Sequence, residues 1–77
     1  MINIKDKALV TALGKRIREL RNKQEISQED LANEADIPLS QIGRIERGET
    51  NPTISTLYVI ANALNVELKV LVDLKLK

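Results

Sequence analysis

The chain has 77 residues, a length that fits one domain near the lower limit for a hydrophobic core without cross-links. It contains no cysteine and no histidine, which excludes disulfides, thiolate zinc sites, cysteine nucleophiles and imidazole bases. The carboxylates form no metal-ligand cluster, and there is no nucleophile–base pair or phosphate loop, so we expect neither an enzyme nor a cofactor site. No apolar run approaches the ~20 residues that cross a bilayer, and the N-terminus has no signal-peptide core. We therefore expect a single cytoplasmic domain over residues 1–77 that does not contact a membrane.

The net charge is only +1, but its distribution along the chain is uneven. Residues 15–23 contain five basic side chains and one acidic one, whereas residues 25–36 contain five acidic side chains and no basic one. Because binding of nucleic acid depends on where the charge lies, one face of this nearly neutral molecule can be basic. The charge pattern alone fits an ordinary solvated helix surface equally well.

Apolar spacing predicts a first helix. Val10, Leu13, Ile17 and Leu20 recur at intervals of three and four residues, which places them on one helical stripe that ends at about Gln24. The basic residues of this segment lie mainly off the stripe, on the side that faces solvent.

Two short helices with a tight turn between them follow. Ser27 and Asp30 form a variant of the capping box, so a second helix is predicted over residues 28–35. Pro38 disfavours helical geometry at the preceding residue and suits the first turn of the next helix, which is predicted over residues 38–47. Gly48 can adopt the left-handed conformation that ends a helix.

A fourth helix is predicted between Thr53, as its N-cap, and Asn65, as its left-handed terminator. Beyond Asn65, residues 67–77 fit either a short helix or a half-buried strand, and we favour a helix followed by an extended tail. Either structure exposes more apolar side chains than so small a domain can cover, so we predict a homodimer. Its predicted interface consists of Tyr58, Leu68, Val70, Val72 and Leu74.

The second and third predicted helices together describe a helix-turn-helix. Ala32 is small, as a close crossing of two helices requires, and the outer face of the third helix is polar. That face carries Ser40, Gln41 and Arg44, whose side chains can donate to base edges in the major groove. Arginine suits guanine and glutamine suits adenine, so double-stranded DNA is the predicted partner.

Four stretches of sequence in order resemble one known family. They are residues 13–21, 27–32, 42–48, and Asn51-Pro52 together with residues 57–64. On these stretches the chain resembles the Cro/phage-repressor type of helix-turn-helix domain, the XRE family, over about residues 13–73. The resemblance implies an all-α fold of bacterial or phage origin, a compact bundle of four or five helices. Its core would span about residues 9–73, with the helix-turn-helix at about 28–47.

The resemblance also implies roles for individual residues. The base-contacting residues would be Leu39, Ser40, Gln41 and Arg44, and the DNA-backbone contacts would be Gln28, Arg16, Arg18, Arg47 and Asn51. Arg21 and Glu46 would form a structural ion pair between the first and third helices.

The chain departs from the family at four positions. Asp36 replaces the usual glycine of the turn, and Pro38 replaces a serine or threonine that caps the third helix. Leu39 replaces a polar base-facing residue, and Gly43 weakens the third helix by roughly 1 kcal/mol relative to alanine.

We therefore predict a sequence-specific transcription regulator, with repression as the expected mode, that binds a palindromic operator as a homodimer. Two alternatives share these features. One is an antitoxin whose strand-like tail engages a toxin protein while its helix-turn-helix autoregulates. The other is a restriction-modification controller.

Overall fold

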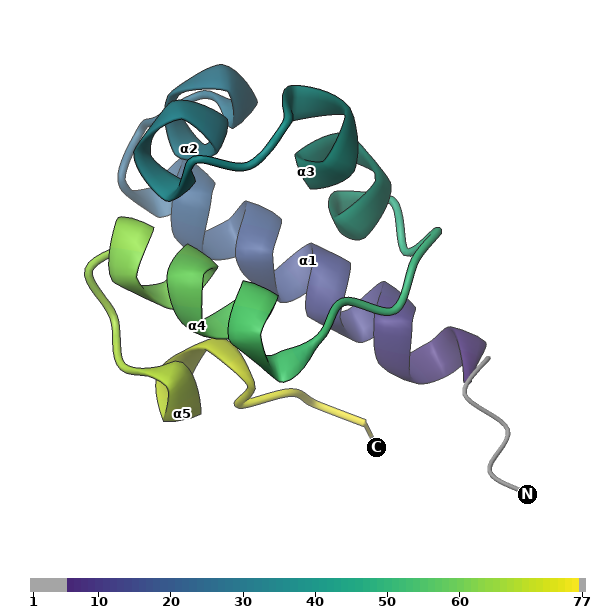
Figure 1. Ribbon diagram of the computed structural model, residues 1–77. Coiled ribbons are helices and arrows are strands. Elements are labelled where there is room, and N and C mark those ends of the chain that lie inside the picture. The colour runs from purple at the N-terminus through teal and green to yellow at the C-terminus, as the bar shows by residue number, and fades with distance from the viewer. Residues whose placement is uncertain (1–5, 77) are drawn as a thin grey trace.

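The computed structural model describes residues 6–76, which form five helices and no strand (Figure 1). The helices are α1 (Lys7–Lys23), α2 (Gln28–Ala35), α3 (Leu39–Glu46), α4 (Ile54–Ala63) and α5 (Leu68–Leu71). The predicted all-α bundle is confirmed. Beyond Asn65 the chain forms the short helix α5, as favoured. Residues 73–76 after it are neither helix nor strand, so the alternative of a strand is wrong for the described residues.

Polar side chains cap the starts of α2 and α4 at the predicted positions. The Oγ of Ser27 accepts from the backbone N–H of Asp30 at 2.9 Å, and Oδ2 of Asp30 accepts from the N–H of Ser27 at 3.3 Å. Both halves of the capping box are therefore present at α2. At α4, Oγ1 of Thr53 accepts from the N–H of Thr56 at 3.1 Å. These bonds satisfy N–H groups that have no partner inside the helix.

The turns rely on left-handed residues. Asp36 has φ 57° and ends α2, so it adopts the conformation that a glycine would supply more cheaply. Gly48 at φ 72° and Asn65 at φ 58° follow α3 and α4 as predicted. Glu25, also at φ 57°, was not predicted. Pro38 corrects a boundary by one residue, because it is the N-cap of α3 and not its first helical residue.

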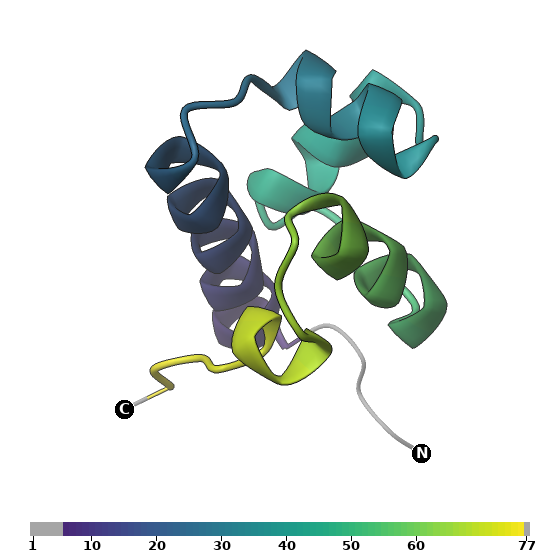
Figure 2. The same ribbon diagram turned by 90° about the vertical axis from the view of Figure 1, so that its left-hand side faces the viewer.

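The core lies where all five helices meet. Its fully buried side chains are Ile17, Leu31, Ile42, Ile45, Ile60, Leu64 and Leu71. Figure 2 shows α1 on one side of the molecule, with α2, α3 and α4 on the other and α5 below them. α1 contacts both α3 and α5, and α4 contacts both α2 and α5, so these two helices connect the helix-turn-helix to the C-terminal helix.

α1 and α3 approach each other most closely at Gly14. A Cβ atom placed on Gly14 would lie 2.5 Å from the carbonyl oxygens of both Ile45 and Glu46. These atoms belong to the backbone, so a side chain at Gly14 would force the two helices apart. At Gly43 an added Cβ would meet only Nη1 of Arg47, at 3.0 Å, which is the far end of a flexible side chain.

The two glycines should therefore respond in opposite ways to alanine. Gly14→Ala is expected to lower the free energy of unfolding by about 1–3 kcal/mol or more, as overpacking does. Gly43→Ala should leave stability unchanged or raise it by up to ~1 kcal/mol, because alanine favours the helix. Urea unfolding followed by far-UV circular dichroism measures both, and equal losses in the two variants would contradict the close approach.

Candidate nucleic-acid interface

The outer face of α3 is polar and its inner face is buried. Ile42 and Ile45 are each 1% exposed, whereas Ser40 and Arg44 point to solvent and Gln41 is half-buried. Three of the four residues predicted to contact bases, Ser40, Gln41 and Arg44, therefore share one face of α3. A shallow hollow on this face is lined by Pro38, Ser40, Gln41, Arg44 and Thr50.

Two details of this face differ from expectation. Leu39 is 46% exposed at the start of α3 but does not line the hollow. Thr50 does line it, although no role was predicted for this residue. The sequence feature that could have indicated Thr50 is its position two residues after Gly48, in the loop that follows α3.

A buried carboxylate ties α1 to α3. Nε of Arg21 donates to Oε2 of Glu46 at 2.7 Å, and Nη2 donates to Oε1 at 2.9 Å. The Glu46 side chain is fully buried, and that of Arg21 is 12% exposed. Arg21 also donates to the carbonyl of Ile26, which holds the loop after α1. The two residues predicted to form a structural pair therefore make a bidentate ion pair, the strong geometry for arginine and a carboxylate.

The carboxylate of Glu46 also contacts two side chains that were predicted to contact the DNA backbone. Nε2 of Gln28 donates to Oε1 of Glu46 at 2.9 Å, and Nε of Arg18 lies 3.5 Å from the same oxygen. The Gln28 amide uses one of its two N–H groups in this way. Arg18 remains 47% exposed, so its outer nitrogens reach the surface. Glu46 thus positions one residue of α1 and one of α2 beside each other.

The ionisation of Glu46 depends on these donors. Burial by itself would raise the pKa of Glu46, but the hydrogen bonds from Arg21 and Gln28 and the charge of Arg21 outweigh it and hold the pKa below its usual value. The hydrogen bond to Glu46 correspondingly raises the pKa of Arg21. The pair is therefore charged at neutral pH.

The loop after α3 holds the other predicted backbone contacts. Arg47 is half exposed and makes two hydrogen bonds to the carboxylate of Glu49, Nε to Oε2 at 2.8 Å and Nη2 to Oε1 at 3.2 Å. This pairing lowers the pKa of Glu49. Asn51 is exposed in the same loop. The acidic partner of Arg47 was missed, although its position two residues along the chain was a usable signal.

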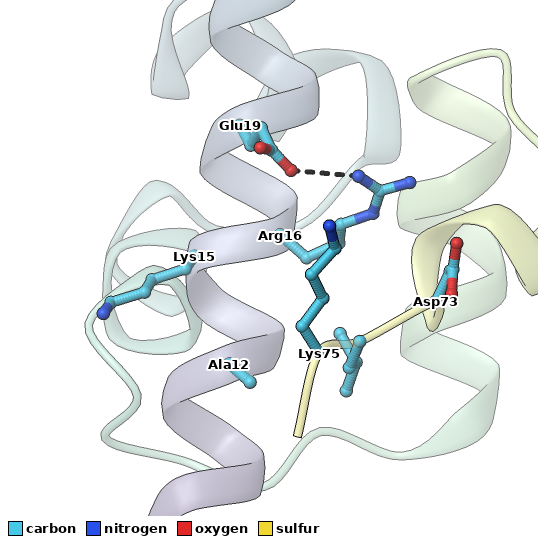
Figure 3. A pocket seen from close by; sticks show the side chains of 7 residues that line it. Ala12, Lys15, Arg16, Glu19, Asp73 and Lys75 are labelled. Carbon is cyan, nitrogen blue, oxygen red and sulfur yellow. Dashed lines mark hydrogen bonds and ion pairs between the residues drawn. The ribbon is translucent and has the colours of Figure 1, made fainter. Parts of the chain in front are cut away.

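Arg16 is not brought to this surface. Its Nε donates to the carbonyl of Val70 in α5 at 3.1 Å, and its Nη1 donates to Glu19 at 2.9 Å. At about 100° per residue, Arg16 is rotated by about 200° around α1 from both Gly14 and Arg18, which face α3. Figure 3 shows Arg16 directed toward the C-terminal segment.

The residues predicted to form a dimer interface divide into two groups. Tyr58 is 56% exposed and Val72 is 40% exposed, so both can meet a second chain. Leu68, Val70 and Leu74 are partly buried, and the first and last of them pack on the core. Further exposed apolar side chains, which were not predicted, are Leu9, Ile54, Val59 and Leu76.

An apolar groove runs beside the C-terminal segment. It is lined by Leu9, Val10, Leu13, Asn51, Pro52, Leu57, Val72, Leu74 and Leu76. Ile54 lies on α4 one turn before Tyr58, about 40° away around the helix, so these two exposed side chains share a face.

Two short helices by themselves do not identify a fold family. Here they form a helix-turn-helix domain, because α2 and α3 are joined by the Asp36 turn and the outer face of α3 is polar. A comparison with protein families agrees, since the helix-turn-helix family model matches residues 17–71. The chain belongs to this family. None of the helices among residues 6–76 is long and apolar enough to cross a membrane.

Two characterised relatives are regulators by name. The control protein C.SmaI of Serratia marcescens is 43% identical over 53 residues, which cover 69% of this chain and 63% of that protein. The immunity repressor of Bacillus phage phi105 is 35% identical over 60 residues, which cover 78% of this chain and 42% of that protein. The chain thus matches less than two thirds of the length of either relative.

Solved structures share the fold. The restriction-modification controller C.AhdI from Aeromonas hydrophila superposes with a TM-score of 0.79 at 35% identity, covering 80% of this chain and 94% of that one. The controller C.Esp1396I, solved as a tetramer with its natural 35-base-pair operator, gives a TM-score of 0.78 at 32% identity. It covers 82% of this chain and 83% of that chain.

Stability should depend on pH through Glu46. Because its folded-state pKa lies below the ordinary value of 4.5, its contribution is complete above that pH and is lost as the pH falls through the folded pKa. At pH 7, Glu46→Gln should cost about 3–5 kcal/mol, since it leaves Arg21 without a buried counter-charge. The difference in urea midpoint between wild type and this variant should narrow steadily below pH 4.5.

Glu49→Gln is the matched control for that series, because Glu49 is half exposed and should change the midpoint little at any pH. A stabilising osmolyte present throughout keeps the variants folded. A constant gap between wild type and Glu46→Gln from pH 7 to pH 3 would contradict the charged pair.

Proposed function

We propose that this protein is a sequence-specific DNA-binding transcription regulator that binds a palindromic operator as a homodimer, with repression as its mode. One observation carries the proposal: Ser40, Gln41 and Arg44 lie on the outer face of a helix whose inner face is buried. A recognition helix needs this arrangement, because a rigid inner face fixes the direction of the outer side chains. The names of the relatives, a phage repressor and a control protein, support the same function.

The base contacts follow from side-chain chemistry. Arg44 is suited to the O6 and N7 acceptors of guanine, and Gln41 to N6 and N7 of adenine. Leu39 has no polar group, so in the major groove it would contact a thymine methyl. Ser40 adds a hydroxyl that can donate or accept.

The backbone contacts surround this face. Gln28 is the first residue of α2, where free N–H groups attract a phosphate, and Glu46 holds Gln28 and Arg18 side by side. Arg47 and Asn51 flank the other end of α3. These four residues would set the position of the domain on the duplex without reading its sequence.

The exposed apolar side chains supply the proposed dimer surface. Tyr58 and Val72 are its predicted members, and Ile54 extends it along α4. A two-fold dimer would present its two copies of α3 about 34 Å apart, one turn of the duplex. The C.Esp1396I tetramer on its operator supports a multimeric DNA complex in this family.

A restriction-modification controller is a second candidate, favoured by the names of C.SmaI, C.AhdI and C.Esp1396I. It is a narrower case of the same activity, and adjacent restriction and methylation genes would identify it. The antitoxin alternative relied on a strand-like tail. Residues 73–76 are neither helix nor strand in the single chain, so this alternative stays a prediction about a chain bound to its partner.

The function is tested by incubating the purified protein with a random duplex library at about 150 mM salt and sequencing the retained DNA. We expect an enriched palindrome whose half-sites lie about 10 base pairs apart. Retention without an enriched motif, or no retention, would reject a regulator that reads an operator by itself.

Arg44→Ala should lower operator affinity by about 1–3 kcal/mol and relax the preference at one base pair of each half-site, because the variant removes only the guanidinium that reads that base. Arg18→Ala is the matched control: it should weaken all duplexes alike and reduce the salt dependence by roughly 0.9 for each phosphate that is no longer neutralised. Fluorescence anisotropy on operator and random DNA separates the two effects. Equal losses of affinity on both DNAs for Arg44→Ala would disprove base recognition by this residue.

Glu49→Gln should strengthen binding to operator and random DNA alike. The carboxylate of Glu49 holds Arg47 at 2.8 Å and adds a negative charge beside the proposed phosphate path, so its removal frees the guanidinium for the duplex. Glu67→Gln is the control, since Glu67 caps α5 and pairs with Lys69. Weaker binding in Glu49→Gln would show that the ion pair orients Arg47 for DNA and does not compete with it.

A further inference from the structure

The side chain of Arg16 joins α1 to the C-terminal segment. Its Nε donates to the carbonyl oxygen of Val70 across 54 positions of sequence, at 3.1 Å in a partly buried setting. Its Nη1 forms an ion pair with Glu19, one turn further along α1, at 2.9 Å. The guanidinium is therefore held at two points, and only 23% of the side chain is exposed.

The carbonyl that Arg16 binds belongs to a helix that needs support. α5 has only four residues, too few for a helix to persist through its own hydrogen bonds. The Val70 carbonyl lies in its last turn, where carbonyls lack helical partners, and its other donor is the N–H of Asp73 at 3.3 Å. A charged donor binds such a carbonyl more strongly than a neutral one. The burial of Leu71 and the bond from Arg16 thus both hold α5 in place.

The chain that leaves α5 carries Val72 of the proposed dimer surface and two further apolar side chains, Leu74 and Leu76. Val72 and Leu76 are 40% and 50% exposed, and Leu74 lies between them. All three line the apolar groove beside α1 and α4. The direction of this segment is set by the last turn of α5, which is where Arg16 binds.

Its surroundings separate Arg16 from the DNA face. Figure 3 shows Glu19, Asp73 and Lys75 around the guanidinium, while Lys15 extends away from it. Glu19 and Asp73 offset the charges of Arg16 and Lys75, so this cluster offers a phosphate no excess of positive charge. Arg18, by contrast, lies on the side of α1 that faces Glu46 and α3.

We infer that Arg16 is a positioning residue for self-association: it fixes α5 and residues 72–76 against α1 so that a second copy of the chain can pack on them. The inference rests on the proposed dimeric function and assigns Arg16 a role different from the phosphate contact expected from sequence. Because α1 also carries Gly14 and Arg18 to α3, one helix supports both the dimer surface and the DNA face.

The test compares three variants by sedimentation equilibrium, each at a temperature where circular dichroism shows it to be fully folded. Arg16→Ala should raise the dimer dissociation constant about tenfold or more. Arg16→Lys should also raise it, because an ammonium lacks the planar fork that bridges Val70 and Glu19, and this milder change keeps the test available if the alanine variant does not fold. Lys15→Ala removes the same charge from the neighbouring position and should leave the constant unchanged.

DNA binding gives the second readout. Above its dimer dissociation constant, Arg16→Ala should bind the operator with wild-type affinity and wild-type salt dependence. A tandem of two Arg16→Ala copies joined by a flexible linker should recover operator binding at low concentration, because linkage replaces association.

Three outcomes would overturn the inference. An unchanged dimer constant in Arg16→Ala, with a salt slope reduced by roughly 0.9, would make Arg16 a phosphate contact and leave the proposed function intact. A tandem that stays weak would likewise reject a role through association. A wild-type chain that remains monomeric and selects no motif would reject the dimeric function itself.

Discussion

The buried carboxylate of Glu46 is the interaction on which the rest of the structure depends. A charge placed in the core is strongly destabilising unless donors surround it, and here Arg21, Arg18 and Gln28 do so from two other helices. Arg18 and Arg21 of α1 reach Glu46 because Gly14 lets the backbone of α1 approach the carbonyls at the end of α3. The orientation of α3 relative to α1 is therefore fixed by the carboxylate of Glu46 and by the absence of a side chain at Gly14.

That fixed orientation determines what α1 can do on its other sides. Residues on the α3 side of this 17-residue helix belong to the proposed DNA face, and Arg16, on the opposite side, binds α5. Because α1 is one continuous helix, it fixes the positions of α3 and α5 relative to each other. In the proposed dimer, the spacing between the two copies of α3 thus depends on how α5 sits against α1.

Short-range signals in the sequence predicted most of the fold. The capping box at Ser27 and the left-handed residues Asp36 and Asn65 act within a few positions, so the pattern alone locates them. Helical spacing places Arg16 and Arg18 about 200° apart around α1, but both lie off the apolar stripe, so the sequence did not show which of them faces α3. The contact of Arg16 with α5 and that of Arg18 with Glu46 decide it. The residues that should face DNA were predicted as a group, but their partners within the chain depend on tertiary contacts that no local pattern encodes.

The charge distribution explains why association matters for such a protein. Each proposed phosphate contact at Arg18 or Arg47 already has an acidic partner, Glu46 or Glu49, and the chain carries a net charge of only +1. Because these acidic partners lie beside the proposed phosphate contacts, they reduce the counterion release that one domain can contribute to sequence-independent affinity. A single recognition helix with three polar side chains adds few base contacts. In the proposed dimer, two linked half-sites would supply the remaining affinity, so occupancy of a palindromic operator would rise steeply with protein concentration.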